Sequence, residues 1–249
     1  MLSPSAASVY AALAALAAAG GAGIAAGGFA YASRWPTSQL FGRTLIAPRN
    51  PGQLALTFDD GPNPAWTPRL LDILAAHDIR ATFFMVGKFV KDERELARRV
   101  ADAGHLIGNH TWSHPDLSRT RAANVLDELT RTSDILANIT GKPVRHFRPP
   151  FGARRPYVVK LARQLGLIPV TWNAMTMDWS EPSADKIAKD LIRKIDSNQR
   201  GGYASNIVLH DGSHRGRNAD RGPSVTAAEQ LLVRYDRTHK FVTLDAWSQ

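Results

Sequence analysis

The chain has 249 residues, a formal net charge of +9 and no cysteine. This length accommodates one large α/β domain, and 44% hydrophobic with 21% charged residues excludes a largely disordered chain. The lack of cysteine excludes disulfides, thiolate metal sites and cysteine nucleophiles, so any metal must bind histidine and carboxylate ligands. The basic residues are scattered and accompany no recognition motif, and we therefore expect no nucleic-acid partner.

Residues 1–32 carry no charged side chain, and the stretch 9–30 is mostly alanine and glycine. Such a length can span a membrane, and Ala30-Tyr31-Ala32 has the small-x-small pattern of a signal-peptidase site. Basic residues begin only at Arg34, which by the positive-inside rule favours a cytoplasmic body. We expect 1–32 to be a signal peptide or membrane anchor, with membrane attachment through 9–30 and a location at the cell envelope; an unstructured leader is the alternative.

Residues 33–52 contain three prolines and are predicted to form an irregular lead-in segment before the folded domain. Residues 53–249 are predicted to form one domain, in which short apolar segments alternate with helical patterns. The expected strands are 54–58, 81–86, 105–109, 146–148, 168–172, 206–210 and 240–244. The expected helices are 67–77, 93–103, 121–139, 156–165, 183–195 and 224–235, with Ser183 as an N-cap. About seven strand–helix repeats predict a parallel sheet, either open or closed into a barrel.

Polar motifs follow the expected strands at the end where the chain leaves them. They are Asp59-Asp60, His110, Arg148, Asp178 and His210. Because the carboxyl ends of parallel strands meet at one edge, where the chemistry of such folds gathers, we expect these side chains to share one site.

Two acidic residues and two histidines predict a metal centre at that edge. Adjacent carboxylates at Asp59 and Asp60 repel each other unless a cation is near, although a solvated turn is the alternative for this pair alone. His110 and His114 stand four residues apart, and we expect a helical turn that points both imidazoles at one ion. With Asp60 they form a set that suits zinc and would also bind ferrous iron, cobalt or nickel.

Two further side chains could assist such an ion. Arg148, in a turn stiffened by two prolines, can pair with Asp59 and keep it ionised; the alternative is a surface arginine. His210 is a candidate proton donor, because the ordinary pKa of histidine lies near neutrality. His214 lies in a glycine- and arginine-rich loop that either contacts an anionic substrate or is simply solvated.

Together the segments TFDDGP, HTWSH, RPPFG and LHDG resemble the polysaccharide deacetylase family, the carbohydrate esterases with a NodB-type domain. The resemblance runs in order from about residue 53 to residue 244. It implies a distorted (β/α) barrel of about seven repeats. It also implies roles for individual residues: Asp59 as general base, Asp60, His110 and His114 as metal ligands, Arg148 as the partner that orients Asp59, and His210 as proton donor.

The remaining implied residues surround the substrate. Phe151, through its backbone N–H, would help to hold the tetrahedral oxyanion, and Trp179 and Leu209 would wall the acetyl pocket. Asp178 and Thr111 would support the site residues from behind. Many family members have a further aspartate three residues before Asp178, where this chain has Met175. We therefore expect a less raised pKa for His210 and reduced activity or a shifted pH optimum, unless Asp178 substitutes for that aspartate.

The resemblance implies a metal-dependent hydrolase that removes acetyl groups from an N-acetylated glycan, such as peptidoglycan or a chitin-like oligosaccharide. One alternative keeps the same site but acts on O-acetyl esters of xylan-type polymers or on small amides. Another, from a different class, is a weakly active sugar-binding domain. The expected partner is the acetylated glycan, and no protein partner is inferred.

Overall fold

The computed structural model describes residues 27–248, so most of the expected signal peptide or membrane anchor lies outside the described residues. Within the described part, residues 27–34 are helical. Between residues 27 and 248, no helix combines the length and the apolar character needed to cross a membrane.

The strands form one curved, parallel sheet in the order β5-β4-β3-β2-β1-β7-β6, with β8 paired to the start of β1. They are β1 (Gln53–Gly61), β2 (Thr82–Met85), β3 (Leu106–Asn109), β4 (His146–Phe147), β5 (Ile168–Pro169), β6 (Ala174–Met175), β7 (Ser205–His210) and β8 (Lys240–Phe241).

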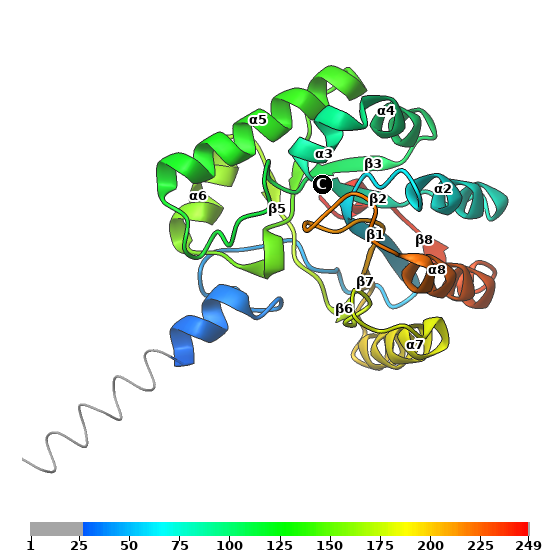
Figure 1. Cartoon of the computed structure of the whole chain (residues 1–249). Coiled ribbons are helices and arrows are strands. Elements are labelled where there is room, and N and C mark those ends of the chain that lie inside the picture. Colours follow the sequence, from blue (N-terminus) through cyan, green and yellow to red (C-terminus); the bar gives the residue numbers. More distant parts are fainter. Residues whose placement is uncertain (1–26, 249) are drawn as a thin grey trace, which may run out of the picture.

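Helices surround this sheet on its outer side (Figure 1). They are α2 (Thr67–Ala76), α3 (Gly87–Asp92), α4 (Arg94–Asp102), α5 (Ala122–Thr140), α6 (Pro156–Gln164), α7 (Ala184–Arg200) and α8 (Gly222–Tyr235). Two short 3₁₀ helices cover Pro150–Gly152 and Leu244–Trp247. The predicted distorted (β/α) barrel is confirmed.

The lead-in segment lies between β5, at one end of the strand order, and the start of β7, near the other end. Leu45 forms a parallel bridge with Val170, immediately after β5. On the other side, the N–H of Ala204 donates to the carbonyl of Pro48 across 2.9 Å. Residues 45–48 therefore lie between the β5 and β7 regions and continue the barrel wall where it would otherwise be open.

The alternation of side chains along β1 separates the core from the site. Leu56 and Phe58 belong to the main hydrophobic core, which lies between the sheet and its helices. Thr57 and Asp59 point to the opposite face, because successive residues of a strand do, and both contact Arg148 there. The same strand thus supplies core residues on one face and site residues on the other.

Every expected strand and helix is present, with boundaries displaced by a few residues. The expected N-cap is confirmed, because the hydroxyl of Ser183 accepts the N–H of Lys186 at 3.2 Å. Four elements of the domain were not expected: α3, β6 and the two 3₁₀ helices. All four are too short to show a helical or strand period in the sequence.

Candidate active site and metal centre

A cavity of about 720 Å³ opens at the carboxyl ends of the strands. Its wall is built from β1, β6 and β7 and from the segments that follow β3, β4, β5, β6 and β7. The expected site residues in its lining are Asp59, Asp60, His110, His114, Phe151, Trp179 and His210. The structure therefore brings together motifs that lie far apart in the sequence, as the shared strand edge predicted.

The end of β1 departs from regular strand geometry at the acidic pair. The pairing register between β1 and β2 shifts between Asp59 and Gly61, and Asp60 has a φ of 71°. This left-handed conformation is costly for a residue with a side chain and is concentrated at functional sites. Because of this irregularity, both carboxylates reach the cavity, although neighbours on a regular strand point to opposite faces.

Asp60, His110 and His114 form a compact set of three metal-ligand side chains. One oxygen of Asp60, Oδ1, lies 3.1 Å from Nε2 of His114 and 3.5 Å from Nε2 of His110. The donor atoms of all three lie within 4.8 Å of one another. Burial would raise the pKa of Asp60, but the close imidazole groups of His110, His114 and His214 hold it well below its usual value.

The chemistry of this set fits a divalent cation. Among residues 27–248, Oδ1 of Asp60 is a buried oxygen without a hydrogen-bond partner. Such an atom is costly unless something compensates its charge, and an ion shared with two imidazole nitrogens would do so. A carboxylate with two histidines is a common ligand set of catalytic zinc.

The segment from His110 to His114 is a bent loop, so the expected helical turn is wrong. Thr111 and His114 both have positive φ angles, of 66° and 63°. The N–H of Thr111 donates to Oδ1 of Asn109 (2.8 Å), and the hydroxyl of Thr111 accepts the N–H of His114 (3.1 Å). These local hydrogen bonds, and not helical spacing, bring the two imidazoles together.

Arg148 is fully buried and holds Asp59 in place. Its Nη1 donates to Asp59 Oδ1 and to Thr57 Oγ1, both at 2.7 Å, and its Nη2 donates to Asn206 Oδ1 at 3.1 Å. The guanidinium lies 4.2 Å from the ring centre of Phe84. Burial lowers the pKa of Arg148, and the Asp59 carboxylate opposes that shift. The expected pair is thus an internal ion pair and not a surface arginine.

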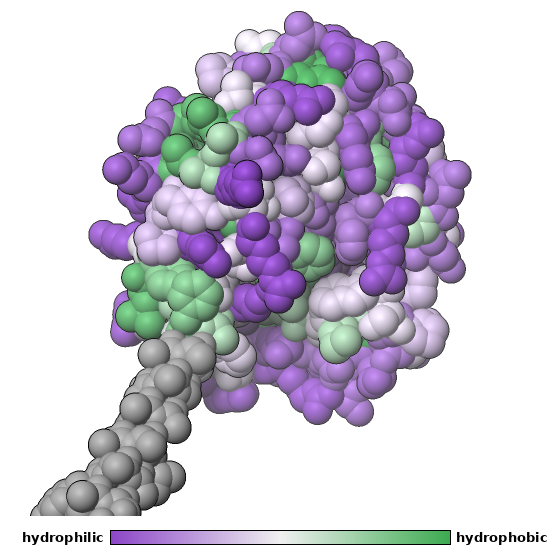
Figure 2. All heavy atoms as spheres, turned by 60° about the vertical axis from the view of Figure 1, so that its left-hand side comes forward, coloured by the Kyte–Doolittle hydropathy of each residue, from purple (hydrophilic) through white to green (hydrophobic). Residues whose placement is uncertain are grey.

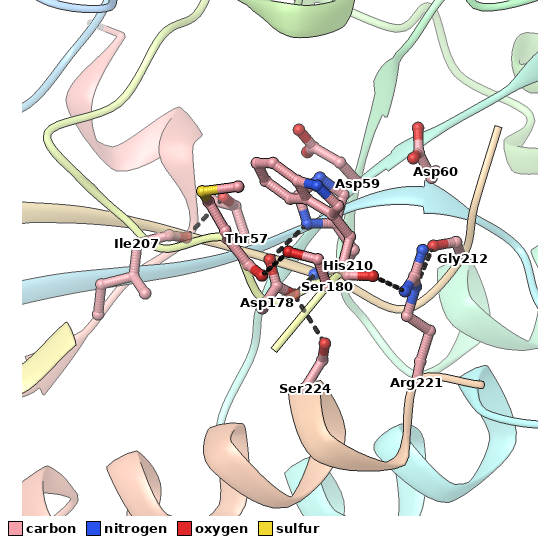
Figure 3. A network of polar contacts seen from close by, with 12 residues as sticks. Thr57, Asp59, Asp60, Asp178, Ser180, Ile207, His210, Gly212, Arg221 and Ser224 are labelled. Carbon is pink, nitrogen blue, oxygen red and sulfur yellow. Dashed lines mark hydrogen bonds and ion pairs between the residues drawn. The ribbon is translucent and has the colours of Figure 1, made fainter. Parts of the chain in front are cut away.

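His210 is supported by Asp178, and Asp178 in turn by Ser224 (Figure 3). Nδ1 of His210 lies 2.8 Å from Asp178 Oδ1, while Oδ2 accepts the His210 N–H at 2.8 Å and the Ser224 hydroxyl at 2.7 Å. Burial alone would lower the pKa of His210, but the charge and hydrogen bond of Asp178 raise it to about 9. His210 is thus a protonated imidazolium at neutral pH.

This contact also decides the role of Met175. Met175 lies in the cavity wall, while Asp178 makes the carboxylate contact to His210. The alternative in which Asp178 substitutes for the missing aspartate is therefore favoured, because Asp178 contacts His210 and raises its pKa.

Three residues were expected around the substrate, and one of them lies elsewhere. Phe151 and Trp179 line the cavity and remain 48% and 44% exposed. Leu209 is fully buried in the main core, so its assignment to the acetyl pocket is wrong. Because side chains alternate along β7, Val208 and His210 face the cavity, and Leu209 faces the helices.

Several contributing residues were not identified from the sequence. They are Thr57, Asn109, Asn206, Arg221 and Ser224. Thr57 and Asn206 could have been found by alternation, because each shares a strand face with a site residue two or four positions away. Asn109, Arg221 and Ser224 act through contacts that only the folded chain brings together.

The fold and the site together define a metal-dependent hydrolase: a parallel (β/α) barrel with a buried ligand set, a paired carboxylate and a protonated histidine at one edge. The family model described as polysaccharide deacetylase matches residues 47–170. A chitooligosaccharide deacetylase of Azorhizobium caulinodans is 37% identical over 174 residues, which are 70% of this chain and 80% of that protein. The chain belongs to the polysaccharide deacetylase family.

Two further comparisons extend over the same domain. A peptidoglycan-N-acetylglucosamine deacetylase of Bacillus cereus is 37% identical over 62% of this chain and 56% of that protein. The solved structure of the Bc1960 peptidoglycan N-acetylglucosamine deacetylase superposes with a TM-score of 0.71 at 32% identity, over 82% of this chain and 91% of the other.

The fold alone does not establish catalysis in this family. A CE4 family pseudoenzyme from Bacillus anthracis superposes equally well, with a TM-score of 0.72 at 26% identity, over 82% of this chain and 68% of the other. Enzyme function is therefore supported also by the similarity to named deacetylases.

Proposed function

We propose that this protein removes acetyl groups from an N-acetylated glycan of the cell envelope, peptidoglycan or a chitin-like oligosaccharide, with zinc held by Asp60, His110 and His114. The observation that carries the proposal is the unpartnered, buried Oδ1 of Asp60, which faces two imidazole nitrogens beside the Arg148-paired Asp59. The chitooligosaccharide and peptidoglycan deacetylases among its relatives support the substrate class.

Asp59 acts as the general base in this proposal. Its Oδ1 is occupied by Arg148, while Oδ2 lies 3.9 Å from Nε2 of His110, on the side of the ligand set. A water molecule between Asp59 and the ligand set would donate its proton to Oδ2. Arg148 fixes the orientation of this carboxylate through the hydrogen bond to Oδ1.

His210 acts as the general acid on the opposite side of the reacting carbonyl. With a pKa of about 9 it carries a proton at neutral pH and can donate it to the leaving amine nitrogen. The backbone N–H of Phe151 donates to the developing oxyanion. Val208, Trp179 and Met175 lie in the wall around the acetyl group and sugar.

Zinc bound to the ligand set would polarise the acetyl carbonyl and lower the pKa of a nearby water molecule. The two-histidine, one-carboxylate set favours zinc, while ferrous iron, cobalt and nickel use the same ligand types. Metal analysis of the protein purified from its native host, by mass spectrometry, would contradict the zinc assignment if another ion predominated at about one equivalent.

The surface beside the start of the described chain supports an envelope location. Phe29, Tyr31 and Trp35 are exposed there, and Figure 2 shows hydrophobic surface gathered at this place. Aromatic side chains next to a basic residue such as Arg34 are typical of membrane interfaces. Export or anchoring predicts that the full chain fractionates with the envelope; recovery in the cytosolic fraction would contradict it.

The test is acetate release from an N-acetylglucosamine oligomer by zinc-loaded protein, by chelated protein and by the Asp59→Ala variant. We expect release only from the zinc-loaded wild-type protein. O-acetylated xylan serves as a second substrate, and release from xylan alone would assign the protein as an esterase. Sugar binding without release from either substrate would favour a binding domain.

A further inference from the structure

The two histidines of the ligand set are held in different ways. Nδ1 of His110 donates to the carbonyl of Arg148 at 2.8 Å, which fixes its ring and leaves Nε2 free to face Asp60. Nδ1 of His114 is buried and has no hydrogen-bond partner within residues 27–248. Since ligand histidines are normally oriented by a hydrogen bond to their second nitrogen, something else must orient His114.

His214 lies against His114 and provides that support. The two imidazoles are stacked, with ring centres 4.5 Å apart and planes inclined by only 9°. Phe151 contacts both rings edge-on, at 4.7 Å from His114 and 5.4 Å from His214. Because the His214 ring stacks on one face of His114 and Phe151 contacts both rings, His114 cannot turn about its side chain without losing these contacts.

His214 also contacts the carboxylate of the ligand set. Its backbone N–H donates to Oδ2 of Asp60 at 3.3 Å, and its Nδ1 lies 3.6 Å from the same oxygen. Oδ1 is the oxygen that faces His110 and His114. His214 therefore holds the oxygen of Asp60 that faces away from the ligand set and leaves Oδ1 for the metal.

The loop that carries His214 is itself anchored to the domain. Arg221 is buried and donates to the carbonyl of Gly212 at 2.6 Å and to that of Trp179 at 3.3 Å (Figure 3). Nζ of Lys88 donates to the carbonyl of His214 at 3.3 Å. With these contacts on both sides, the position of the His214 ring is set by the folded domain.

We propose that His214 is a positioning residue of the metal centre, which aligns His114 by stacking and Asp60 by contact with Oδ2. The inference rests on the proposed ligand set and adds to it a residue of the loop after β7. Residues that orient metal ligands from behind typically change metal affinity by about 10- to 100-fold when replaced. We expect a change of that size for loss of both contacts.

Three substitutions separate the two contacts. His214→Ala removes the ring and Nδ1, His214→Phe keeps a ring to stack on His114, and His214→Asn keeps a polar group near Asp60 without a ring. The control is Asn218→Ala, an exposed position in the same loop. The dissociation constant for zinc is measured by chelator competition, and the melting temperature of the metal-free proteins checks that the fold is intact.

We expect His214→Ala to raise the zinc dissociation constant by about 10- to 100-fold, the Phe and Asn variants to lie between it and wild type, and saturating zinc to restore most of the activity. If His214→Ala leaves the zinc dissociation constant unchanged and changes only KM for the oligomer, the inference is overturned. His214 would then be a substrate-contacting residue of the cavity wall. Failure of the wild-type protein itself to bind zinc would instead refute the proposed function.

Discussion

Strands β3 and β4 carry basic side chains at both of their ends, and the surroundings of these side chains differ between the two ends. At the amino ends, His105 and His146 are buried, and burial lowers the pKa of each to about 4. At the carboxyl ends, His110 and Arg148 face carboxylates in a site where the pKa of His210 is raised to about 9.

The difference follows from the partners of each side chain. Nδ1 of His105 accepts the backbone N–H of Ala81 at 3.2 Å, and Nε2 of His146 lies 3.0 Å from the hydroxyl of Ser248. Neither partner is a carboxylate, so burial keeps both rings neutral. Burial alone thus lowers the pKa of a histidine and favours its neutral form. A fixed carboxylate such as Asp178 instead raises the pKa, so that a buried histidine can act as a proton donor.

The largest effect should come from removing the charge that balances Asp59. Arg148→Met leaves a buried carboxylate without its partner, and we expect a loss of about 3–5 kcal/mol of unfolding free energy together with the activity. Urea denaturation and acetate release measure the two losses. The double variant Asp59→Asn, Arg148→Met should regain part of the stability and none of the activity. A single Arg148→Met variant of wild-type stability would contradict the ion-pair account.

The next effect concerns the proton of His210. Asp178→Asn removes the charge that raises its pKa, so the alkaline limb of the pH–rate profile should move down by about 1–2 pH units. The stability that the wild-type pair contributes is fully present below the unfolded pKa of about 6.5 and is lost as pH rises through about 9. Ser224→Ala, which keeps the Asp178 charge, is the control, with a smaller shift expected. An unmoved limb in Asp178→Asn would exclude His210 as the acid.

The two faces of β7 give a matched pair of variants. Leu209→Ala should cost about 2–5 kcal/mol of stability, because it opens a cavity in the main core, without changing the choice of acyl group. Val208→Ala should instead raise the rate on N-propionyl relative to N-acetyl substrate by a few-fold, because it enlarges the acetyl pocket. If Leu209→Ala alters acyl preference and Val208→Ala does not, our assignment of the two faces is reversed.

A pH-dependent effect should appear at the opposite end of the barrel. The folded protein binds fewer protons than the unfolded chain between pH 6.5 and 4, because burial keeps the side chains of His105 and His146 neutral. Stability should therefore fall as pH drops through this window, by about 1–2 kcal/mol per histidine at pH 5. His105→Asn keeps an acceptor for Ala81 and removes the titration. Its urea midpoint should drop less between pH 7 and pH 5 than that of wild type, and an identical drop would refute this source of acid sensitivity.

The sequence was sufficient to predict the barrel and the residues that meet at its edge, since motifs such as Asp59-Asp60 and His210 follow apolar strand segments. Pairing of Arg148 with Asp59 also followed from charge. The conformation between His110 and His114 did not, because positive φ angles at Thr111 and His114 leave no trace in residue spacing.

Two further features required the folded chain. The family resemblance implied that Leu209 walls the pocket, whereas strand alternation along β7 places Val208 in the cavity wall and Leu209 in the core. The role of His214 depends on a loop of irregular conformation after β7, whose stacking on His114 no local pattern indicates.

In the proposed site, one metal ion at Asp60, His110 and His114 works with Asp59 as base. The most direct measurement is a zinc titration of chelated protein, with bound metal and acetate release followed together for wild type and Asp59→Asn. Our account predicts that both proteins bind one equivalent of zinc, and that only wild type releases acetate, in proportion to the zinc bound. Acetate release by the metal-free protein, or full activity of Asp59→Asn at one equivalent, would contradict it.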